Sequence, residues 1–259
     1  MYKVLTIAGS DCSGGAGIQA DLKTITAHRM YAMSAITALT AQNTTGVYGV
    51  QESTAEFLGQ QLDCIFTDIM PDAVKIGMVS SAENINVIAQ KLQQYHAKNI
   101  VLDTVMYATS GHALLRPEAM EALRTQLLPL ADIITPNIPE AEALWGASIA
   151  DRGQMEQAGF DIAQHIRGAV LVKGGHLVET ANDLLIWNGQ AIWLEGERID
   201  NPNTHGTGCT LSSAIACALA GGAEMPEAVR QAKEYLTGAL RDGLNLGRGS
   251  GPVNHCWAL

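Results

Sequence analysis

The sequence predicts an α/β fold built on a mostly parallel central sheet, with helices on both faces and a small antiparallel edge. Short runs rich in Val and Ile alternate with longer segments of helical periodicity, which is the pattern of βα winding. With 259 residues, of which 47% are hydrophobic, the chain is long enough to bury a large core. Since no internal repeat, low-complexity tract or linker divides it, we expect a single domain over residues 1–259.

The first half of the chain contains three of these strand and helix alternations. A strand at residues 4–8 precedes a helix at about 16–30, whose Ile18, Leu22, Ile25 and Arg29 share one face. The pattern then predicts a helix at 54–68, a strand at 73–76, a helix at 82–96 and a strand at 99–103. Strands that are joined by helices in this way run parallel.

The second half continues the alternation and ends differently. The pattern predicts a helix at 117–128, a strand at 132–135, a helix opened by Pro139, a helix at 154–166 and a strand at 169–173. Strands at 184–187 and 191–194 flank Asn188-Gly189, a dipeptide that favours the tight turn of an antiparallel hairpin. Two helices, at 207–220 and 226–242, follow this edge.

Charge and cysteine usage exclude several classes of protein. The chain has 26 acidic and 16 basic residues, a net charge of −10, and no run of Lys and Arg, so nucleic acid is not an expected partner. Its five cysteines are scattered, without the spacing of a zinc site or a disulfide framework, as expected in a reducing compartment. No leader or membrane-spanning stretch is recognisable, and we expect a soluble cytoplasmic protein.

The segment NTHGTGCTLSSA, residues 203–214, is the most informative in the chain. Gly206 and Gly208 allow a turn in which successive N–H groups point outward, and the helix that follows adds the positive end of its dipole. This is the arrangement of an oxyanion and phosphate cradle. The helix start should lower the pKa of Cys209, which makes it a candidate to accept a proton. The alternative is that Cys209 is a small buried helix residue.

A second glycine-rich segment, residues 9–17, follows the first predicted strand. Within it GAGIQA matches the dinucleotide-binding fingerprint, but no acidic residue occurs between Asp21 and Glu52 to hold a ribose, so we set that interpretation aside. The glycines instead let the backbone approach a small planar ligand, with Asp21 one turn into the next helix. Helix capping or a solvated face is the alternative for Asp21.

Polar residues at the ends of later predicted strands indicate phosphate chemistry. No G-x-x-x-x-G-K-[ST] segment is present, so a Walker-type loop is excluded. Asp103, Asn137 and Glu140 offer oxygen ligands for magnesium, with turn and cap chemistry as the alternative. Lys173, followed by Gly174-Gly175, could reach a polyphosphate or simply be solvated. His176 and His205 are more typical of hydrogen-bonding loop residues than of metal ligands.

Together these motifs resemble the ribokinase-like superfamily of small-molecule kinases, and within it the hydroxymethylpyrimidine and phosphomethylpyrimidine kinases of thiamine biosynthesis. The resemblance runs end to end. It is carried by LTIAGSDCSGGAGIQADLKT, ITALTAQNTTGV, VKIGM, NIVLDTVM, ITPNIPEAEAL, VLVKGGH, NTHGTGCTLSSA and GPVNH. It implies phosphorylation, with ATP, of 4-amino-5-hydroxymethyl-2-methylpyrimidine and then of its monophosphate at one site. Relatives of this fold are often dimers, so a homodimer is an expectation by analogy.

The resemblance also implies roles for individual residues. Cys209 would be the base, and Gly206, Thr207 and Gly208 the anion hole. Gln42 would read the pyrimidine edge, because an amide offers both a donor and an acceptor. Met78 and Val105 would wall the ring, with core packing as the alternative for both. Gly9, Ala16 and Asp21 are the other substrate contacts that we expect. Nucleotide contacts would be Lys173, Asn137, Glu140 and Gly175, with Asp103 and Glu140 holding Mg²⁺.

Two alternatives to this function remain at the level of sequence. A pyridoxal kinase of the same subgroup shares the glycine-rich start and the cysteine turn, although relatives of that kind tend to carry an apolar residue where this chain has Gln42. A catalytically silent pyrimidine-binding protein would keep the ring pocket and have no use for Asp103, Lys173 and Cys209 together. A requirement for a monovalent cation cannot be read from the sequence.

Overall fold

The computed structural model describes residues 1–106, 114–175 and 182–259. In these residues the centre of the fold is a nine-stranded sheet, in the spatial order β3-β2-β1-β4-β5-β6-β7-β8-β9. The strands are β1 (Lys3–Asp11), β2 (Tyr31–Asn43), β3 (Gly46–Glu52), β4 (Ala73–Ile76), β5 (Ile100–Leu102), β6 (Ile133–Ile134), β7 (Ala169–Val172), β8 (Asp183–Trp187) and β9 (Gln190–Leu194). The strands from β2 to β7 in this order pair in parallel.

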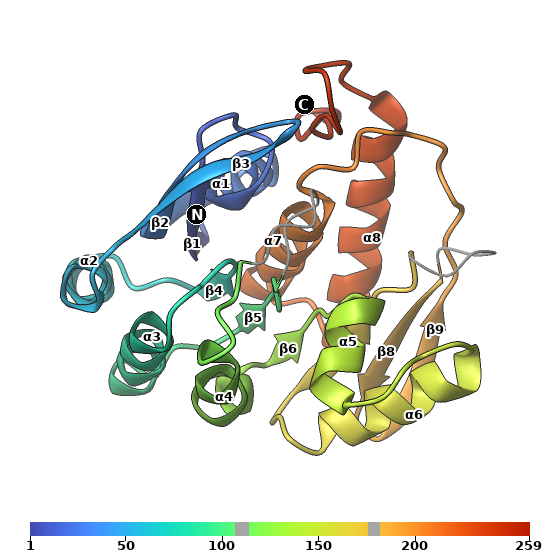
Figure 1. The fold of residues 1–259 in the computed structure, drawn as a ribbon, viewed down its shortest axis with the longest axis horizontal. Helices are drawn as coiled ribbons and strands as arrows, with labels where there is room; N and C mark the ends of the chain where they lie inside the picture. The colour runs from blue at the N-terminus through green and yellow to red at the C-terminus, as the bar shows by residue number, and fades with distance from the viewer. Residues whose placement is uncertain (107–113, 176–181) are drawn as a thin grey trace.

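Helices cover both faces of the sheet, as the sequence predicted (Figure 1). One face carries α2 (Ala55–Asp68), α3 (Ala82–Gln94), α4 (Ala119–Ala122), α5 (Ile138–Trp145) and α6 (Arg152–Ala163). The other carries α1 (Gly17–Ala27), α7 (Thr207–Ala220) and α8 (Met225–Asp242). Leu5 and Ile7 of β1 belong to the first core and Val4 to the second, because alternate residues of a strand face opposite sides.

The antiparallel hairpin at one edge of the sheet is confirmed. β7 pairs antiparallel with β8, and β8 with β9. Asn188 and Gly189 join β8 to β9 with φ of 50° and 71°, both in the left-handed region that a type I′ turn requires.

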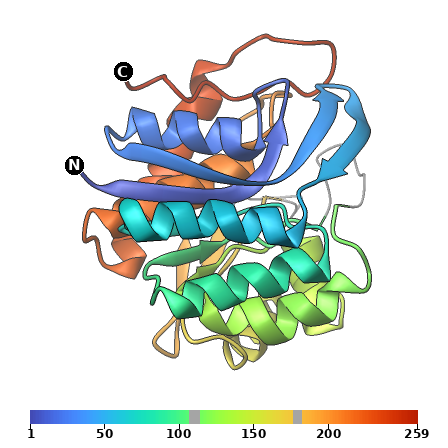
Figure 2. The ribbon, with the colours of Figure 1, turned by 90° about the vertical axis from the view of Figure 1, so that its left-hand side faces the viewer.

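A second antiparallel edge, formed by β2 and β3, was not predicted. β2 is rich in Ala, Ser and Thr, so its alternation of buried and exposed positions gives only a weak apolar signal in the sequence. The ribbon of β2 and β3, in light blue, lies at one margin of the molecule in Figure 2. Its position matters for the site, because Gln42 lies near the turn between these two strands.

The helix predicted over residues 117–128 is present but irregular. After α4 the chain forms a π-helical turn at Leu123–Leu127 and a 3₁₀ turn at Leu128–Leu130. Pro129 has no N–H to continue an α-helix, and the helical segment ends one residue after it.

The segment after α8 folds back toward the β2–β3 turn (Figure 2). Thr44 accepts hydrogen bonds from the backbone N–H groups of Arg248 and Gly249, and His205 pairs with Pro252 in an isolated bridge. This segment therefore joins the edge ribbon to the loop before α7. None of the helices in the described part of the chain has the length and apolar character needed to cross a membrane.

Candidate active site

A cavity of about 1020 Å³ lies at the C-terminal edge of the parallel strands, where ligands bind in open α/β sheets. Its wall includes every predicted site residue except Asp21. These residues are Gly9, Ala16, Gln42, Met78, Asp103, Val105, Asn137, Glu140, Lys173, Gly175, Gly206, Thr207, Gly208 and Cys209. The residues that follow the predicted strands are far apart in the sequence, and the fold brings them together in the wall of one cavity. His176 lies outside the described residues.

The start of α7 forms part of the cavity wall. Gly206 is the residue before the first helical turn and has φ of 84°, with no side chain capping the first N–H groups. A Cβ atom at Gly206 would lie 1.9 Å from the carbonyl oxygen of Gly15, so only glycine fits between the two loops. The N–H of Thr207 donates to the carbonyl oxygen of Thr204. The next N–H groups, of Gly208 and Cys209, belong to residues of the cavity wall, where the positive end of the helix dipole favours an anion.

Replacing Gly206 by alanine is expected to lower the free energy of unfolding by about 2 kcal/mol, because the left-handed backbone is strained for alanine and the new methyl group overlaps Gly15. Urea denaturation measures this change. Gly208→Ala is the matched control. Its Cβ would lie 3.3 Å from Oδ2 of Asp103 and 3.5 Å from Nζ of Lys173, so it should keep stability and lose activity by filling the anion site. Equal stability of the two variants would contradict this account.

The expectation of a lowered pKa at Cys209 was wrong. Burial raises the pKa of the Cys209 thiol to about 11, because it removes the thiolate from water. The ammonium of Lys75 lowers this pKa, whereas the carboxylates of Asp21 and Asp103 raise it. The helix start alone does not compensate for burial. Cys209 nevertheless lines the cavity and remains partly exposed.

Asp103 and Lys173 form an ion pair on one side of the α7 start. Asp103 follows β5 and Lys173 follows β7, and Nζ of Lys173 lies 3.1 Å from Oδ1 of Asp103. Thr135 also donates to Oδ1 of Asp103 over 3.0 Å. Burial raises the pKa of Asp103, but the cations of Lys173 and Lys75 outweigh it, so the net shift is downward. Asp103 is thus an ionised carboxylate in a nearly dry site, 2% exposed.

Asn137 and Glu140 form a capping box at the start of α5, so the cap chemistry considered for them is present. Oδ1 of Asn137 accepts from the N–H of Glu140, and Oε2 of Glu140 accepts from the N–H of Asn137, both over 2.9 Å. Burial raises the pKa of Glu140, which is 4% exposed. Among the residues that the structure describes, the hydrogen-bond contact of its Oε1 is a long one of 3.5 Å, with the N–H of Met106. One oxygen therefore remains with capacity for another partner.

The residues present fit a magnesium ion that is shared with phosphate. Within residues 1–106, 114–175 and 182–259, no group of three or more His, Cys, Asp or Glu side chains could hold a metal by itself. Mg²⁺ usually takes only one or two carboxylates and completes its shell with water and phosphate oxygens. Asp103 and Glu140 meet that requirement at the cavity wall.

The opposite side of the cavity holds Gln42 and a pair that the sequence did not reveal. Nε2 of His205 lies 2.8 Å from Oδ2 of Asp11 and 3.4 Å from Nε2 of Gln42. Thr40 donates to Oε1 of Gln42 over 3.0 Å. Both Asp11 and His205 line the cavity. Hydrogen bonds from His205 and Ser13 hold the pKa of Asp11 below its ordinary value although burial opposes them.

The role of Asp11 had only a weak signal in the sequence. Its carboxylate accepts hydrogen bonds from the N–H groups of Gly15 and Ala16, so it fixes the glycine-rich turn through which the backbone approaches the cavity. An acid at the start of a Gly-rich loop is commonly a turn residue. His205 does act as a hydrogen-bonding loop residue, as expected, but its partner lies 194 positions away.

The expectation that Asp21 contacts the substrate is corrected by the structure. Asp21 is completely buried and lies beneath the cavity, not in its wall. Both carboxylate oxygens accept from Nζ of Lys75 over 2.8 Å. Thr6 and Ser213 donate to the remaining positions. Since its acceptors are used by protein partners, Asp21 has no oxygen to offer a ligand.

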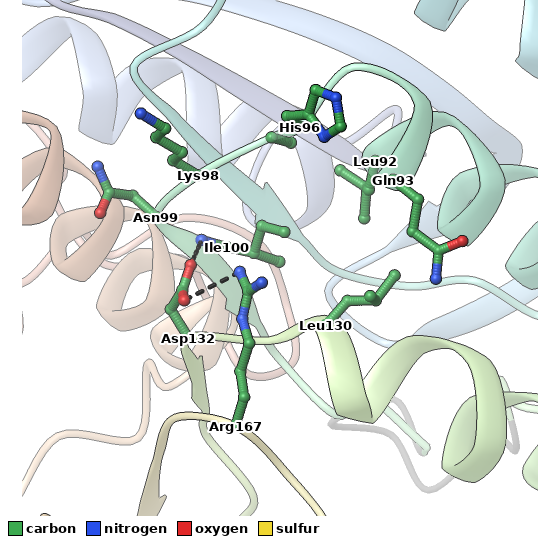
Figure 3. Close-up of a pocket in the computed structure, with 10 residues that line it drawn as sticks. Leu92, Gln93, His96, Lys98, Asn99, Ile100, Leu130, Asp132 and Arg167 are labelled. Carbon is green, nitrogen blue, oxygen red and sulfur yellow. Dashed lines mark hydrogen bonds and ion pairs between the residues drawn. The ribbon is translucent and has the colours of Figure 1, made fainter.

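A second cavity, of about 710 Å³, lies at the opposite edge of the sheet, where β5 begins (Figure 3). In the figure Arg167 and Asp132 point toward one another, and their charged groups lie 2.9 Å apart. Asp132 also accepts from the backbone N–H of Ile100 over 2.8 Å. Asp132, which directly precedes β6, thus links this strand to the start of β5. The wall of this cavity contains none of the predicted site residues.

Comparison with known proteins gives consistent matches over nearly the whole chain. The family described as phosphomethylpyrimidine kinase matches residues 11–254. The hydroxymethylpyrimidine/phosphomethylpyrimidine kinase of Streptomyces coelicolor is 48% identical over 256 residues, covering 99% of this chain and 95% of the relative. The thiamine biosynthesis bifunctional protein ThiED of Geobacter sulfurreducens is 50% identical over 98% of this chain. The chain spans about half of that longer protein, 52% of its length.

Solved structures with the same architecture include two kinds of kinase. The phosphomethylpyrimidine kinase of Clostridium difficile 630 has a TM-score of 0.83 and 49% identity, covering 92% of this chain and 98% of that one. The pyridoxal kinase of Bacillus subtilis, solved as an ADP complex, has a TM-score of 0.92 and 40% identity, covering 98% and 97%. The predicted fold class is thereby confirmed, and the nucleotide complex is consistent with the phosphate chemistry of the cavity.

Proposed function

Because this chain belongs to the phosphomethylpyrimidine kinase family, we propose that it transfers the γ-phosphoryl group of ATP to 4-amino-5-hydroxymethyl-2-methylpyrimidine and then to the resulting monophosphate. One observation carries the proposal. The start of α7 lies next to the charged groups of Asp103 and Lys173, and His205 just before it lies 3.4 Å from the amide of Gln42, all in the wall of one cavity. Such an arrangement suits a phosphoryl group that passes between a nucleotide and a small ring.

In the first transfer, the hydroxymethyl oxygen forms a bond to the γ-phosphorus while the bond from that phosphorus to the β–γ bridging oxygen breaks. ADP leaves with that electron pair, and the hydroxymethyl proton passes to the thiolate of Cys209, which becomes the thiol. The N–H groups at the α7 start and the ammonium of Lys173 stabilise charge on the transferred group. In the second transfer, a phosphate oxygen of the monophosphate takes the place of the hydroxyl.

The remaining residues position the two substrates. Gln42 and Met78 hold the ring, with the amide matching the amine and ring nitrogen of an aminopyrimidine. Asp103 and Glu140 would hold Mg²⁺, which would neutralise phosphate charge. Lys173 lies at the end of β7, beside the glycines that leave room for the nucleotide. The pair of His205 and Asp11 fixes the position of Gln42 relative to the glycine-rich turn, because His205 contacts Gln42 and Asp11 accepts from the turn.

Phosphorylation of pyridoxal is a second candidate, which the resemblance to the pyridoxal kinase of Bacillus subtilis favours. The two rings differ in the polar groups that they present, so the side chain at position 42 should discriminate between them. Gln42→Met is expected to lower kcat/KM for the pyrimidine about 100-fold, since a buried polar edge then loses its partner. The loss for pyridoxal should be far smaller. Equal losses on both substrates would rule out this role for Gln42.

Initial rates with purified protein, ATP and Mg²⁺ test the proposal as a whole. The hydroxymethylpyrimidine, its monophosphate and pyridoxal are offered separately, and products are identified by mass spectrometry. Mono- and pyrophosphorylated pyrimidine are the expected products. Turnover of pyridoxal alone would assign the protein to the second candidate. Binding of the pyrimidine without ATP consumption, in folded protein, would indicate a binding protein.

A further inference from the structure

A group of polar side chains is buried within the otherwise apolar layer between the sheet and helices α1 and α7. Lys75 stands in the middle of β4 and is completely buried. It pairs in register with Thr6 of β1, so both side chains face the same side of the sheet. Burying the charged group of a lysine lowers the free energy of unfolding by several kcal/mol unless an opposite charge is paired with it. Lys75 is paired, with Asp21 of α1.

The ion pair is fixed from three sides. Nζ of Lys75 lies 2.8 Å from each oxygen of Asp21. Thr6 donates to Oδ2 of Asp21 over 2.6 Å, and Ser213 donates to Oδ1 over 2.8 Å. The carboxylate of Asp21 is therefore held by partners on β1, β4 and α7, and it fixes the ammonium of Lys75, which cannot reorient without breaking both of its hydrogen bonds to Asp21.

The pair lies beneath the catalytic end of α7. Ser213 is four residues after Cys209, so the two side chains share one face of the helix. Nζ of Lys75 also approaches the turn after β4, within 2.7 Å of where a Cβ atom of Gly77 would be. The charged groups that act on the Cys209 thiol are Lys75 from β4, Asp21 from α1, Asp103 after β5 and Lys173 after β7. The two cations favour negative charge on the sulfur, and Lys75 is the one that Asp21 holds in place.

We propose that Lys75 is a positioning residue of the phosphoryl-transfer site, whose buried ammonium, held by Asp21, supplies a fixed positive charge beneath Cys209. This inference rests on the proposed function for the role of Cys209, but not for the electrostatic contact itself. A preorganised charge in a dry site stabilises charge that develops during the reaction without having to reorient. The alternative is an ion pair that only joins α1, β4 and α7.

Two isosteric variants separate these roles, since each breaks the same ion pair. Lys75→Met removes the cation, and Asp21→Asn removes the anion while leaving an amide oxygen for Lys75. The rate of alkylation of Cys209 by iodoacetamide, followed by peptide mass spectrometry from pH 7 to 10, should fall about tenfold in Lys75→Met and rise in Asp21→Asn. Cys12 is the internal control, because its thiol contacts the backbone of Gln42 and not this pair.

A purely structural pair would give changes in the same direction for both variants, which would overturn the proposal. The double variant Lys75→Met/Asp21→Asn covers the case in which a single variant does not fold, since it leaves no unpaired buried charge. Its thermal stability should exceed that of Lys75→Met, with kcat still about tenfold below the wild type and KM unchanged. Full recovery of kcat would overturn the proposal. Because alkylation needs no substrate, its result stands apart from the proposed function.

Discussion

Replacing Cys209 by alanine is expected to lower kcat for phosphorylation of the hydroxymethyl group by about 10²- to 10⁴-fold, the usual contribution of a general base. KM for the pyrimidine should change little, because the residues that we assign to the ring, Gln42 and Met78, are other side chains of the cavity wall. Steady-state kinetics with ATP and Mg²⁺ measures both constants. Cys256→Ala is the matched control, since Cys256 is exposed near the C-terminus.

The pH dependence of this rate follows from the same side chain. Only the thiolate accepts a proton, and the pKa of Cys209 is raised to about 11, so the thiol form predominates at neutral pH. As the pH increases from 7 to 9, kcat of the wild type should therefore rise by about tenfold per pH unit. Cys209→Ala should lose that slope. A flat profile for the wild type would show that the hydroxyl loses its proton without help from Cys209.

Replacing Asp103 by asparagine is expected to lower kcat/KM by about 10²- to 10³-fold, a loss typical of removing one preorganised charge-stabilising group. The variant removes the carboxylate that we assign to Mg²⁺ and leaves Lys173 without its partner at 3.1 Å. The Mg²⁺ concentration for half-maximal rate should rise as well. A magnesium titration at saturating pyrimidine measures both effects.

Asp132 is the control for Asp103, because it is also an aspartate next to a strand of the sheet and is also paired with a cation. Asp132→Asn breaks the ion pair with Arg167 at the opposite edge of the sheet, so it should leave kcat/KM and the magnesium requirement close to those of the wild type. Similar losses in the two variants would mean that Asp103 contributes through stability. An unchanged magnesium requirement in Asp103→Asn would place the ion elsewhere.

Much of the fold could be predicted because its signals are local. The apolar strand β4 and helix α7 were predicted with the boundaries that the structure has, and the Asn188-Gly189 turn identified the hairpin. The cavity wall could also be predicted, because a parallel sheet gathers its strand ends at one edge. The ribbon of β2 and β3 could not, since its small residues carry little periodic signal.

Other features of the site depend on contacts between distant segments. Asp21 was expected to contact the substrate because it follows a glycine-rich turn, but its partner Lys75 is 54 positions away and is visible only in the folded chain. The pKa of Cys209 was misjudged for a similar reason: the helix start is local, whereas burial is produced by the whole fold. The pairing of His205 with Asp11 joins the loop before α7 to the end of β1, 194 positions earlier.

Cys209 is the proposed base for a hydroxyl group, and the two phosphorylations test this role within one variant. A hydroxymethyl group must lose a proton, whereas a phosphate monoester has a second pKa of about 6 and is already mostly ionised at neutral pH. We would measure initial rates of Cys209→Ala with the hydroxymethylpyrimidine and with its monophosphate, by mass spectrometry. The first rate should fall about 10²- to 10⁴-fold and the second far less. Equal losses in both rates would contradict the assignment of Cys209 as a base.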